Sequence, residues 1–94
     1  MKRIDILVPC YNEEAVLHQF YERTSSVLEQ IENYQFTFIF VNDGSRDRTI
    51  SIIRELYEKD ARVSYISLSR NFGKEGAVFA GLEHASGDCC VVMD

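Results

Sequence analysis

The stretch Phe36-Thr37-Phe38-Ile39-Phe40-Val41, followed at once by Asn42-Asp43-Gly44-Ser45, decides the fold of this chain. Its first half is almost purely aromatic and β-branched, which is the composition of a strand that is covered on both faces. Its second half is polar and contains an Asp-Gly pair, which is typical of a turn. Ligands bind beyond the carboxyl ends of the strands in a parallel α/β sheet, so this junction indicates a binding site.

Three further strands and three helices are expected around this segment. Short apolar runs predict strands at 4–9, 63–68 and 88–93. The strand at 63–68 is expected near an edge of the sheet. Apolar residues that recur at intervals of three and four predict helices from about residue 13, after residue 47, and over 74–85. The inner faces of the first two helices are expected to contain Leu17, Phe20, Tyr21, Thr24, Val27, Leu28 and Ile31, and Ile50, Ile53, Leu56 and Tyr57.

Local polar residues predict how the helices begin and end. Asn12 is a suitable N-cap for the first helix, and Ser45 or Asp47 for the second. Gly87 stands where a left-handed C-terminal cap would end the third helix.

The alternation of strands and helices predicts a βαβαβαβ chain. We expect an α/β fold of the Rossmann-like three-layer type, with a parallel sheet, right-handed crossovers and strand order 3-2-1-4. The connection would then reverse between the first and fourth strands, and a crevice should open between Pro9 and Asp94. Because the chain stops at the end of a strand, we expect residues 1–94 to be the first part of a longer protein, with a sheet edge open for pairing.

Composition excludes several classes of protein. The chain of 94 residues is 46% hydrophobic and 27% charged, as in an ordinary globular domain. Its net charge of −5 argues against nucleic-acid binding. No apolar run approaches the roughly 20 residues of a membrane span, and the N-terminus lacks the pattern of a secretory signal. Cys10, Cys89 and Cys90 have no metal-ligand spacing, so we expect buried, reduced thiols in a cytoplasmic protein.

Each predicted strand end carries groups that suit one part of a nucleoside diphosphate. Tyr11 offers a flat face for a base, and Asp43 can accept a hydrogen bond from a ring N–H or a sugar hydroxyl. Arg70 and Lys74 precede a helix N-terminus, where charge and backbone N–H groups bind phosphate. Asp94 can bind Mg²⁺ or Mn²⁺. Each feature also has a simpler explanation: a capped helix start, an Asp-Gly turn, a solvated loop or an ordinary terminal acid.

Together these strand ends resemble a known family. The matching motifs are Pro9-x-Tyr11-Asn12-Glu13, Asn42-Asp43-Gly44-Ser45-x-Asp47-x-Thr49, Arg70-Asn71-x-Gly73-Lys74-x-Gly76-Ala77 and the final Asp94. They look like the start of the family-two inverting glycosyltransferases of the GT-A fold, and the resemblance covers essentially the whole chain. The run from Arg70 to Ala77 is most similar to the enzymes that transfer a sugar to a polyprenyl phosphate, such as dolichol-phosphate mannose synthases and bactoprenol glucosyltransferases.

The resemblance implies roles for single residues. Asp43 would hydrogen-bond the base, while Arg70 and Lys74 would lie near the diphosphate or the acceptor phosphate. Asp94 would be the first acid of the family's Asp-x-Asp motif, which holds Mg²⁺ or Mn²⁺. Asn42 stands where many members have a second Asp. The whole nucleotide site would contain Pro9, Tyr11, Asn12, Glu13, Asp43, Gly44 and Ser45.

The resemblance also implies a reaction and its limits. A sugar would pass with inversion from a UDP- or GDP-sugar to an acceptor such as a polyprenyl phosphate, in a cytoplasmic enzyme whose full-length form works at the membrane. The second metal acid, the acceptor half and the C-terminal membrane-associated segment of family members lie beyond residue 94. We therefore expect residues 1–94 to be the truncated nucleotide-sugar-binding part of a glycosyltransferase domain, inactive alone.

Two other classes of protein compete with this interpretation. A nucleotidyltransferase also binds nucleotides at such a sheet edge, but it would favour a Gly-rich basic loop after the first strand, and residues 9–14 contain neither glycine nor a cation. A non-catalytic interaction module, dimeric through the open sheet edge, would need no nucleotide at all.

Overall fold

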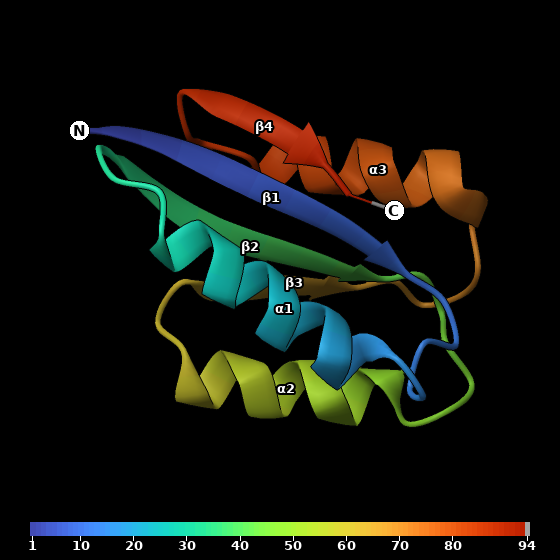
Figure 1. Cartoon of the computed structure of the whole chain (residues 1–94). Coiled ribbons are helices and arrows are strands. Elements are labelled where there is room, and N and C mark those ends of the chain that lie inside the picture. Colours follow the sequence, from blue (N-terminus) through green and yellow to red (C-terminus); the bar gives the residue numbers. More distant parts are fainter. Residues whose placement is uncertain (94) are drawn as a thin grey trace.

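The computed structural model describes residues 1–93 and shows a four-stranded parallel sheet between two layers of helices (Figure 1). The strand order is β3-β2-β1-β4, and α1 and α2 lie on the opposite face of the sheet from α3, which confirms the predicted α/β architecture. The elements are β1 (Lys2–Cys10), α1 (Leu17–Glu29), β2 (Tyr34–Asn42), α2 (Thr49–Lys59), β3 (Val63–Ser67), α3 (Gly73–His84) and β4 (Cys89–Val92).

The three N-terminal strands end at the same edge of the sheet. β1 and β2 pair in register over nine residues, from Lys2 opposite Tyr34 to Cys10 opposite Asn42. β3 joins with Ser67 opposite Asn42. The polar segments that follow these strands therefore leave the sheet side by side.

The two faces of β2 are buried in different cores, as its composition predicts. Phe38 and Phe40 are fully buried and pack with Ile53 and Leu56 of α2 on one face. Ile39 and Val41 pack on the other face with a cluster that contains Leu7 of β1 and Ala77 of α3. The paired stripes show why this strand carries no polar residue between Thr37 and Asn42.

The first helix begins later than the sequence predicts. α1 starts at Leu17, after a turn in which the carbonyl of Glu13 accepts hydrogen bonds from the N–H groups of Val16 and Leu17. Asn12 is not its N-cap, because Asn12 has a positive φ of 51° and its Oδ1 accepts from the N–H of Arg46. The predicted inner face is also too wide, since Val27 and Ile31 are exposed.

The second helix differs from its prediction at its start and at one residue of its inner face. α2 begins at Thr49, and Oδ1 of Asp47 accepts from the Thr49 N–H at 2.9 Å, whereas Ser45 bonds to the loop after β1. Of the predicted inner face, Tyr57 is exposed and its ring meets that of Tyr65 edge-on.

The turn before β4 is held by a buried carboxylate. Asp5 on β1 is 2% exposed and accepts hydrogen bonds from the hydroxyl of Thr37 and the N–H groups of Ser86 and Gly87. Burial alone would raise the pKa of Asp5, but these hydrogen bonds and Arg3 lower it below its usual value. Gly87 is not the predicted left-handed cap, because its φ is not positive and Ala85 is the C-cap of α3; glycine is needed there because a Cβ would lie 2.7 Å from the carbonyl oxygen of Arg3.

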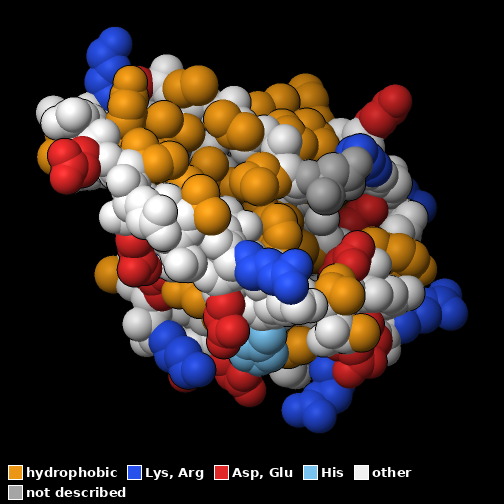
Figure 2. All heavy atoms as spheres, viewed as in Figure 1, with side chains coloured by type: hydrophobic (Ala, Val, Ile, Leu, Met, Phe, Trp, Pro, Cys, Tyr) orange, Lys and Arg blue, Asp and Glu red, His pale blue; other side chains and the backbone are white. Residues whose placement is uncertain are grey.

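The edge strand β4 is more open than expected. Cys10 is buried, but Cys89 is exposed and Cys90 half-buried, so the prediction of three buried thiols is wrong for β4. Figure 2 shows hydrophobic side chains gathered over β4 and the adjoining part of β1. Within residues 1–93, no helix has the length and apolar character needed to cross a bilayer.

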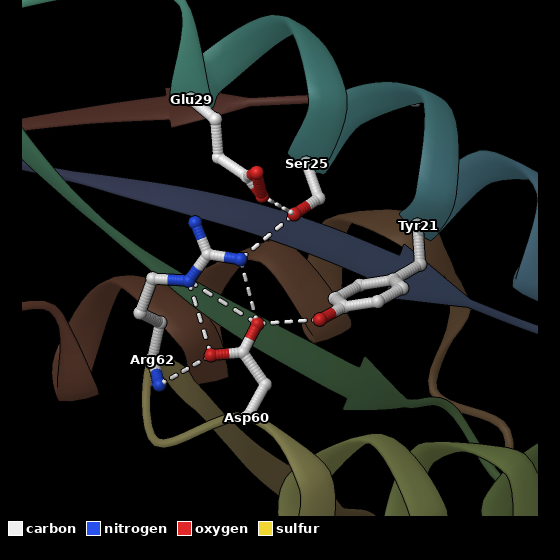
Figure 3. Close-up of polar contacts among 5 residues, drawn as sticks. All are labelled: Tyr21, Ser25, Glu29, Asp60 and Arg62. Carbon is white, nitrogen blue, oxygen red and sulfur yellow. Dashed lines mark hydrogen bonds and ion pairs between the residues drawn. The ribbon is translucent and has the colours of Figure 1, made fainter.

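A polar cluster ties α1 to the turn between α2 and β3 (Figure 3). The guanidinium of Arg62 donates to Asp60 at 2.8 Å and to the hydroxyl of Ser25 at 2.7 Å. Tyr21 donates to Asp60, and Ser25 donates to Glu29. The hydrogen bonds from Arg62 are the main cause that lowers the pKa of Asp60 to about 2.

Replacing the Asp60 carboxylate should lower stability in a pH-dependent way. We expect Asp60→Asn to reduce the free energy of unfolding by about 2 kcal/mol near neutral pH. Because the folded pKa lies below the ordinary 3.8, this contribution is present above about pH 4 and is lost as the pH falls towards about 2. Urea unfolding at several pH values measures it. Glu58→Gln, on the exposed side of α2, is the control, and an Asp60→Asn deficit that did not change with pH would contradict the assignment.

Candidate functional site

A pocket of about 230 Å³ lies beyond the carboxyl ends of the first three strands. It is bordered by the loop after β1 and by the loop between β3 and α3, over the end of β2. The predicted crevice between Pro9 and Asp94 involves a residue that lies outside the described part of the chain, so it stays a prediction. The lining residues are Pro9, Cys10, Tyr11, Glu13, Asp43, Asn71, Gly73 and Lys74.

Of the nine predicted site residues that the structure describes, five line this pocket and four do not. Pro9, Tyr11, Glu13, Asp43 and Lys74 belong to the lining. Those outside the lining are Asn12, Gly44, Ser45 and Arg70.

The loop after β1 is bonded to the loop after β2 through four hydrogen bonds. The N–H groups of Asn12, Glu13 and Glu14 donate to Ser45 Oγ, Thr49 Oγ1 and Asp47 Oδ2 at 3.0, 2.8 and 3.3 Å. In return, Asn12 Oδ1 accepts from the N–H of Arg46 at 2.9 Å. The polar motif after β2 therefore satisfies the backbone of its neighbour, and this fixes the pocket wall that contains Glu13.

The buried side chains of Asn42 and Thr49 make further hydrogen bonds beneath these loops. Asn42 is 4% exposed, its Oδ1 accepting from the N–H of Ser45 and its Nδ2 donating to Ser67 Oγ. Thr49 is fully buried and its hydroxyl also donates to Asp47. Burial would raise the pKa of Asp47, but the hydrogen bonds from Thr49 lower it below its ordinary value.

Asp43 connects the loop after β2 with the loop after β3. Its side chain is almost fully buried, and Oδ1 accepts from the N–H of Phe72 at 2.7 Å. Asn71 Nδ2 lies 3.3 Å from both the carbonyl oxygen and Oδ2 of Asp43. The carboxylate that the sequence assigns to the base is thus also a structural acceptor.

Of the two predicted phosphate-binding residues, Lys74 lines the pocket and Arg70 does not. Lys74 lies in the first turn of α3, and it lines the pocket together with Gly73, at the helix end whose N–H groups favour anions. Arg70 lies outside the lining, its guanidinium carbon 4.5 Å from the centroid of the Phe72 ring. A guanidinium that stacks on a ring keeps its in-plane N–H groups available as donors.

Cys10, Asn71 and Gly73 line the pocket without having been predicted as site residues. Asn71 and Gly73 stand in the recognised motif, so the motif itself was the signal that could have found them. Cys10 had none. Its thiol is 1% exposed, and burial, followed by the charge of Glu13, raises its pKa to about 12, so it stays protonated and unreactive.

Metal ligands are not assembled within the described part of the chain. Residues 1–93 hold no group of three or more His, Cys, Asp or Glu side chains that could bind a metal ion. Asp94, the predicted ligand, lies outside the described residues.

A larger hollow of about 460 Å³ lies at the opposite, amino-terminal edge of the sheet. Its lining includes Arg3, Glu29, Tyr34 and Arg62, but no residue of the predicted site. Arg62 is already paired with Asp60. We therefore take the smaller pocket as the candidate site, since it combines a helix N-terminus, a lysine and the strand ends.

α/β domains with an open parallel sheet bind their ligands beyond the carboxyl ends of the strands, and the pocket described here lies at that position. The profile described as "Glycosyl transferase family 2" matches residues 5–94. The chain is 50% identical over 90 residues to the "Uncharacterized glycosyltransferase YkcC" of Bacillus subtilis, covering 95% of this chain and 27% of that protein. It is 45% identical over 92 residues to the "Prophage bactoprenol glucosyl transferase homolog" of Escherichia coli, covering 98% and 30% respectively. The chain belongs to glycosyl transferase family 2 and spans less than a third of these relatives.

Solved structures agree with this assignment. Residues 1–349 of TarS from S. aureus superpose with a TM-score of 0.77 at 26% identity, covering all of this chain and 27% of that one. The mannosyltransferase PcManGT from Pyrobaculum calidifontis, solved with GDP-Man and Mn²⁺, gives 0.74 at 26% identity, covering 93% and 25%. The predicted GT-A type of fold is confirmed.

The buried Thr49 hydroxyl allows a test of the bonds between the first two loops. Thr49→Val keeps the shape but leaves the Glu13 N–H and Asp47 without this partner. We expect a loss of about 1–2 kcal/mol in the free energy of unfolding and faster hydrogen exchange at the Glu13 amide. Thr49→Ser, which retains the hydroxyl, should keep the Glu13 amide protected. Equal exchange in all three proteins would show that the hydroxyl does not hold this loop.

Proposed function

We propose that residues 1–94 are the nucleotide-sugar-binding part of a glycosyltransferase that transfers a sugar from a UDP- or GDP-sugar with inversion. The observation that carries this proposal is the meeting of Tyr11, Glu13, Asp43 and Lys74 at one pocket beyond the strand ends. Family membership supports it. Two solved neighbours add to this support, since TarS was solved with UDP-GlcNAc and PcManGT with GDP-Man.

In this proposal the pocket is divided between nucleoside and phosphates. Tyr11 packs against the base and, with Pro9 and Glu13, lines the nucleoside part. Asp43 accepts a hydrogen bond from the base through the lone pairs that Phe72 and Asn71 leave available. Lys74 and the N-terminus of α3 bind the diphosphate, and Arg70 adds a second positive charge from the same loop. Asn12, Gly44 and Ser45 shape the site from behind the lining.

The remaining parts of the reaction are proposed from the relatives. The names of the bactoprenol glucosyl transferases support a polyprenyl phosphate as acceptor, and hence a cytoplasmic enzyme that works at the membrane surface. The Mn²⁺ in the PcManGT complex supports a requirement for Mg²⁺ or Mn²⁺, with Asp94 as a ligand. Such a cation would neutralise charge on the departing diphosphate.

Nucleotide binding tests the proposal directly. We expect calorimetric titration to detect one of UDP and GDP, with tighter binding when Mn²⁺ is present. Lys74→Gln should weaken that binding about tenfold, because a charge-assisted contact with phosphate is worth about 1.5 kcal/mol or more. Lys59→Gln, at the far end of α2, removes the same charge from a site away from the pocket and should bind like the parent protein.

Two results would contradict this assignment. Equal nucleotide binding by the Lys74→Gln and Lys59→Gln proteins would show that this pocket is not the nucleotide-binding site. No nucleotide binding, together with a mass that rises with concentration in sedimentation, would favour an interaction module that pairs through β4. The exposure of Val91 and Val92 on that edge strand supports this second candidate.

We also expect the 94-residue chain to transfer no sugar by itself. It spans only 27–30% of the length of these relatives, and we expect the acceptor to bind to groups outside residues 1–94. The assay uses a radiolabelled UDP- or GDP-sugar with polyprenyl phosphate and divalent cation. Product formed by the purified chain above the level of a Lys74→Gln sample would prove this expectation wrong.

A further inference from the structure

The loops after β2 and β3 approach each other closely at Gly44. A Cβ atom built on Gly44 would lie 2.3 Å from the carbonyl carbon of Arg70 and 2.4 Å from the nitrogen of Asn71. Both are backbone atoms, so no side-chain movement could relieve the clash. Gly44 also has a positive φ of 67°, which L-residues other than glycine adopt at a cost. The loop after β2 is therefore pressed against residues 70–71 of the next loop.

Asp43 holds the same two loops together through hydrogen bonds. Its Oδ1 accepts from the Phe72 N–H at 2.7 Å, and its Oδ2 and carbonyl oxygen receive Asn71 Nδ2 at 3.3 Å. A carboxylate that accepts from a backbone N–H forms one of the stronger hydrogen bonds in proteins. Asp43 is only 3% exposed, so little water competes for it.

The segment that these contacts hold has few other attachments. Residues 68–72 connect β3 to α3, and 69–72 are exposed. Besides the contacts of Asp43 and Gly44, the N–H of Leu68 donates to the carbonyl of Asn42. Asn71, Gly73 and Lys74, at the end of this segment, form the pocket wall opposite residues 9–13.

We propose that Asp43 and Gly44 form a clasp that positions Asn71 and Lys74, and that nucleotide affinity depends on this clasp as well as on direct contacts. Asp43 is thus a positioning residue, in addition to any hydrogen bond that it accepts from the base. The inference rests on the proposed function, because it concerns the same nucleotide pocket.

Gly44→Ala separates positioning from direct contact. Gly44 lies outside the pocket lining, whereas a Cβ there would clash with the backbone of residues 70–71 and displace it. Asn33→Ala is the matched control: Asn33 also has a positive φ, 73°, but lies in the turn before β2 at the opposite edge of the sheet. Both proteins carry backbone strain, and only one carries the clash.

Two measurements are made on each protein. Calorimetric titration with UDP and GDP should show affinity at least tenfold weaker for Gly44→Ala and unchanged for Asn33→Ala. Hydrogen exchange followed by NMR without nucleotide should show the Phe72 amide at least tenfold faster in Gly44→Ala, with the amides of β1 and β2 still protected. In the parent protein, nucleotide at ten times its Kd should slow exchange at Phe72 about tenfold, a result that needs no variant.

Each contrary outcome has a definite meaning. If the parent protein binds nucleotide and Gly44→Ala binds equally well, or if nucleotide leaves Phe72 exchange unchanged, the clasp is wrong and the proposed function stands. If the parent protein binds neither nucleotide, the proposed function fails and the effect of the clasp on affinity fails with it. Phe72 exchange in the free Gly44→Ala protein then still decides whether Asp43 and Gly44 hold the loop.

Discussion

The in-register parallel pairing of β1 and β2 is the constraint on which the rest of this structure depends. Nine consecutive residue pairs leave Cys10 and Asn42 side by side, so the two loops that follow must run next to each other over one edge of the sheet. α1 and α2 start from these loops and cover the same face, while α3 covers the other. A shift of this register by one residue would turn the stripe containing Phe38 and Phe40 towards α3 and separate the loops.

The polar motif after β2 serves its neighbours as much as any ligand. Ser45, Asp47 and Thr49 accept hydrogen bonds from the backbone after β1, and Asp43 accepts one from the backbone after β3. Short side chains with an acceptor oxygen suit both tasks, because they reach an adjacent loop without filling the pocket. Such a motif is therefore constrained by packing between loops, and a substitution within it can change binding without touching the ligand.

Most of the fold could be predicted from the sequence, because strand composition, helix periodicity and crossover handedness are local or general rules. The convergence of Tyr11, Asp43 and Lys74 followed from the same topology. Details that depend on contacts between loops could not be predicted: Asn12 looks like a helix cap, yet its partners are 33 and 34 residues away. Likewise, nothing local distinguishes the buried Cys10 from the exposed Cys89. The roles of the pocket residues towards a nucleotide stay predictions.

The buried carboxylate of Asp5 bears on how the chain folds as it is made. This residue belongs to the N-terminal strand, but two of its donors, Ser86 and Gly87, are more than 80 residues further along. During vectorial synthesis β1 thus leaves the ribosome before the backbone groups that bond to Asp5 and before its neighbour β4. Until residues 86–92 emerge, the Asp5 carboxylate stays hydrated and one edge of β1 stays unpaired, so the native surroundings of β1 are completed only after β4 has been made.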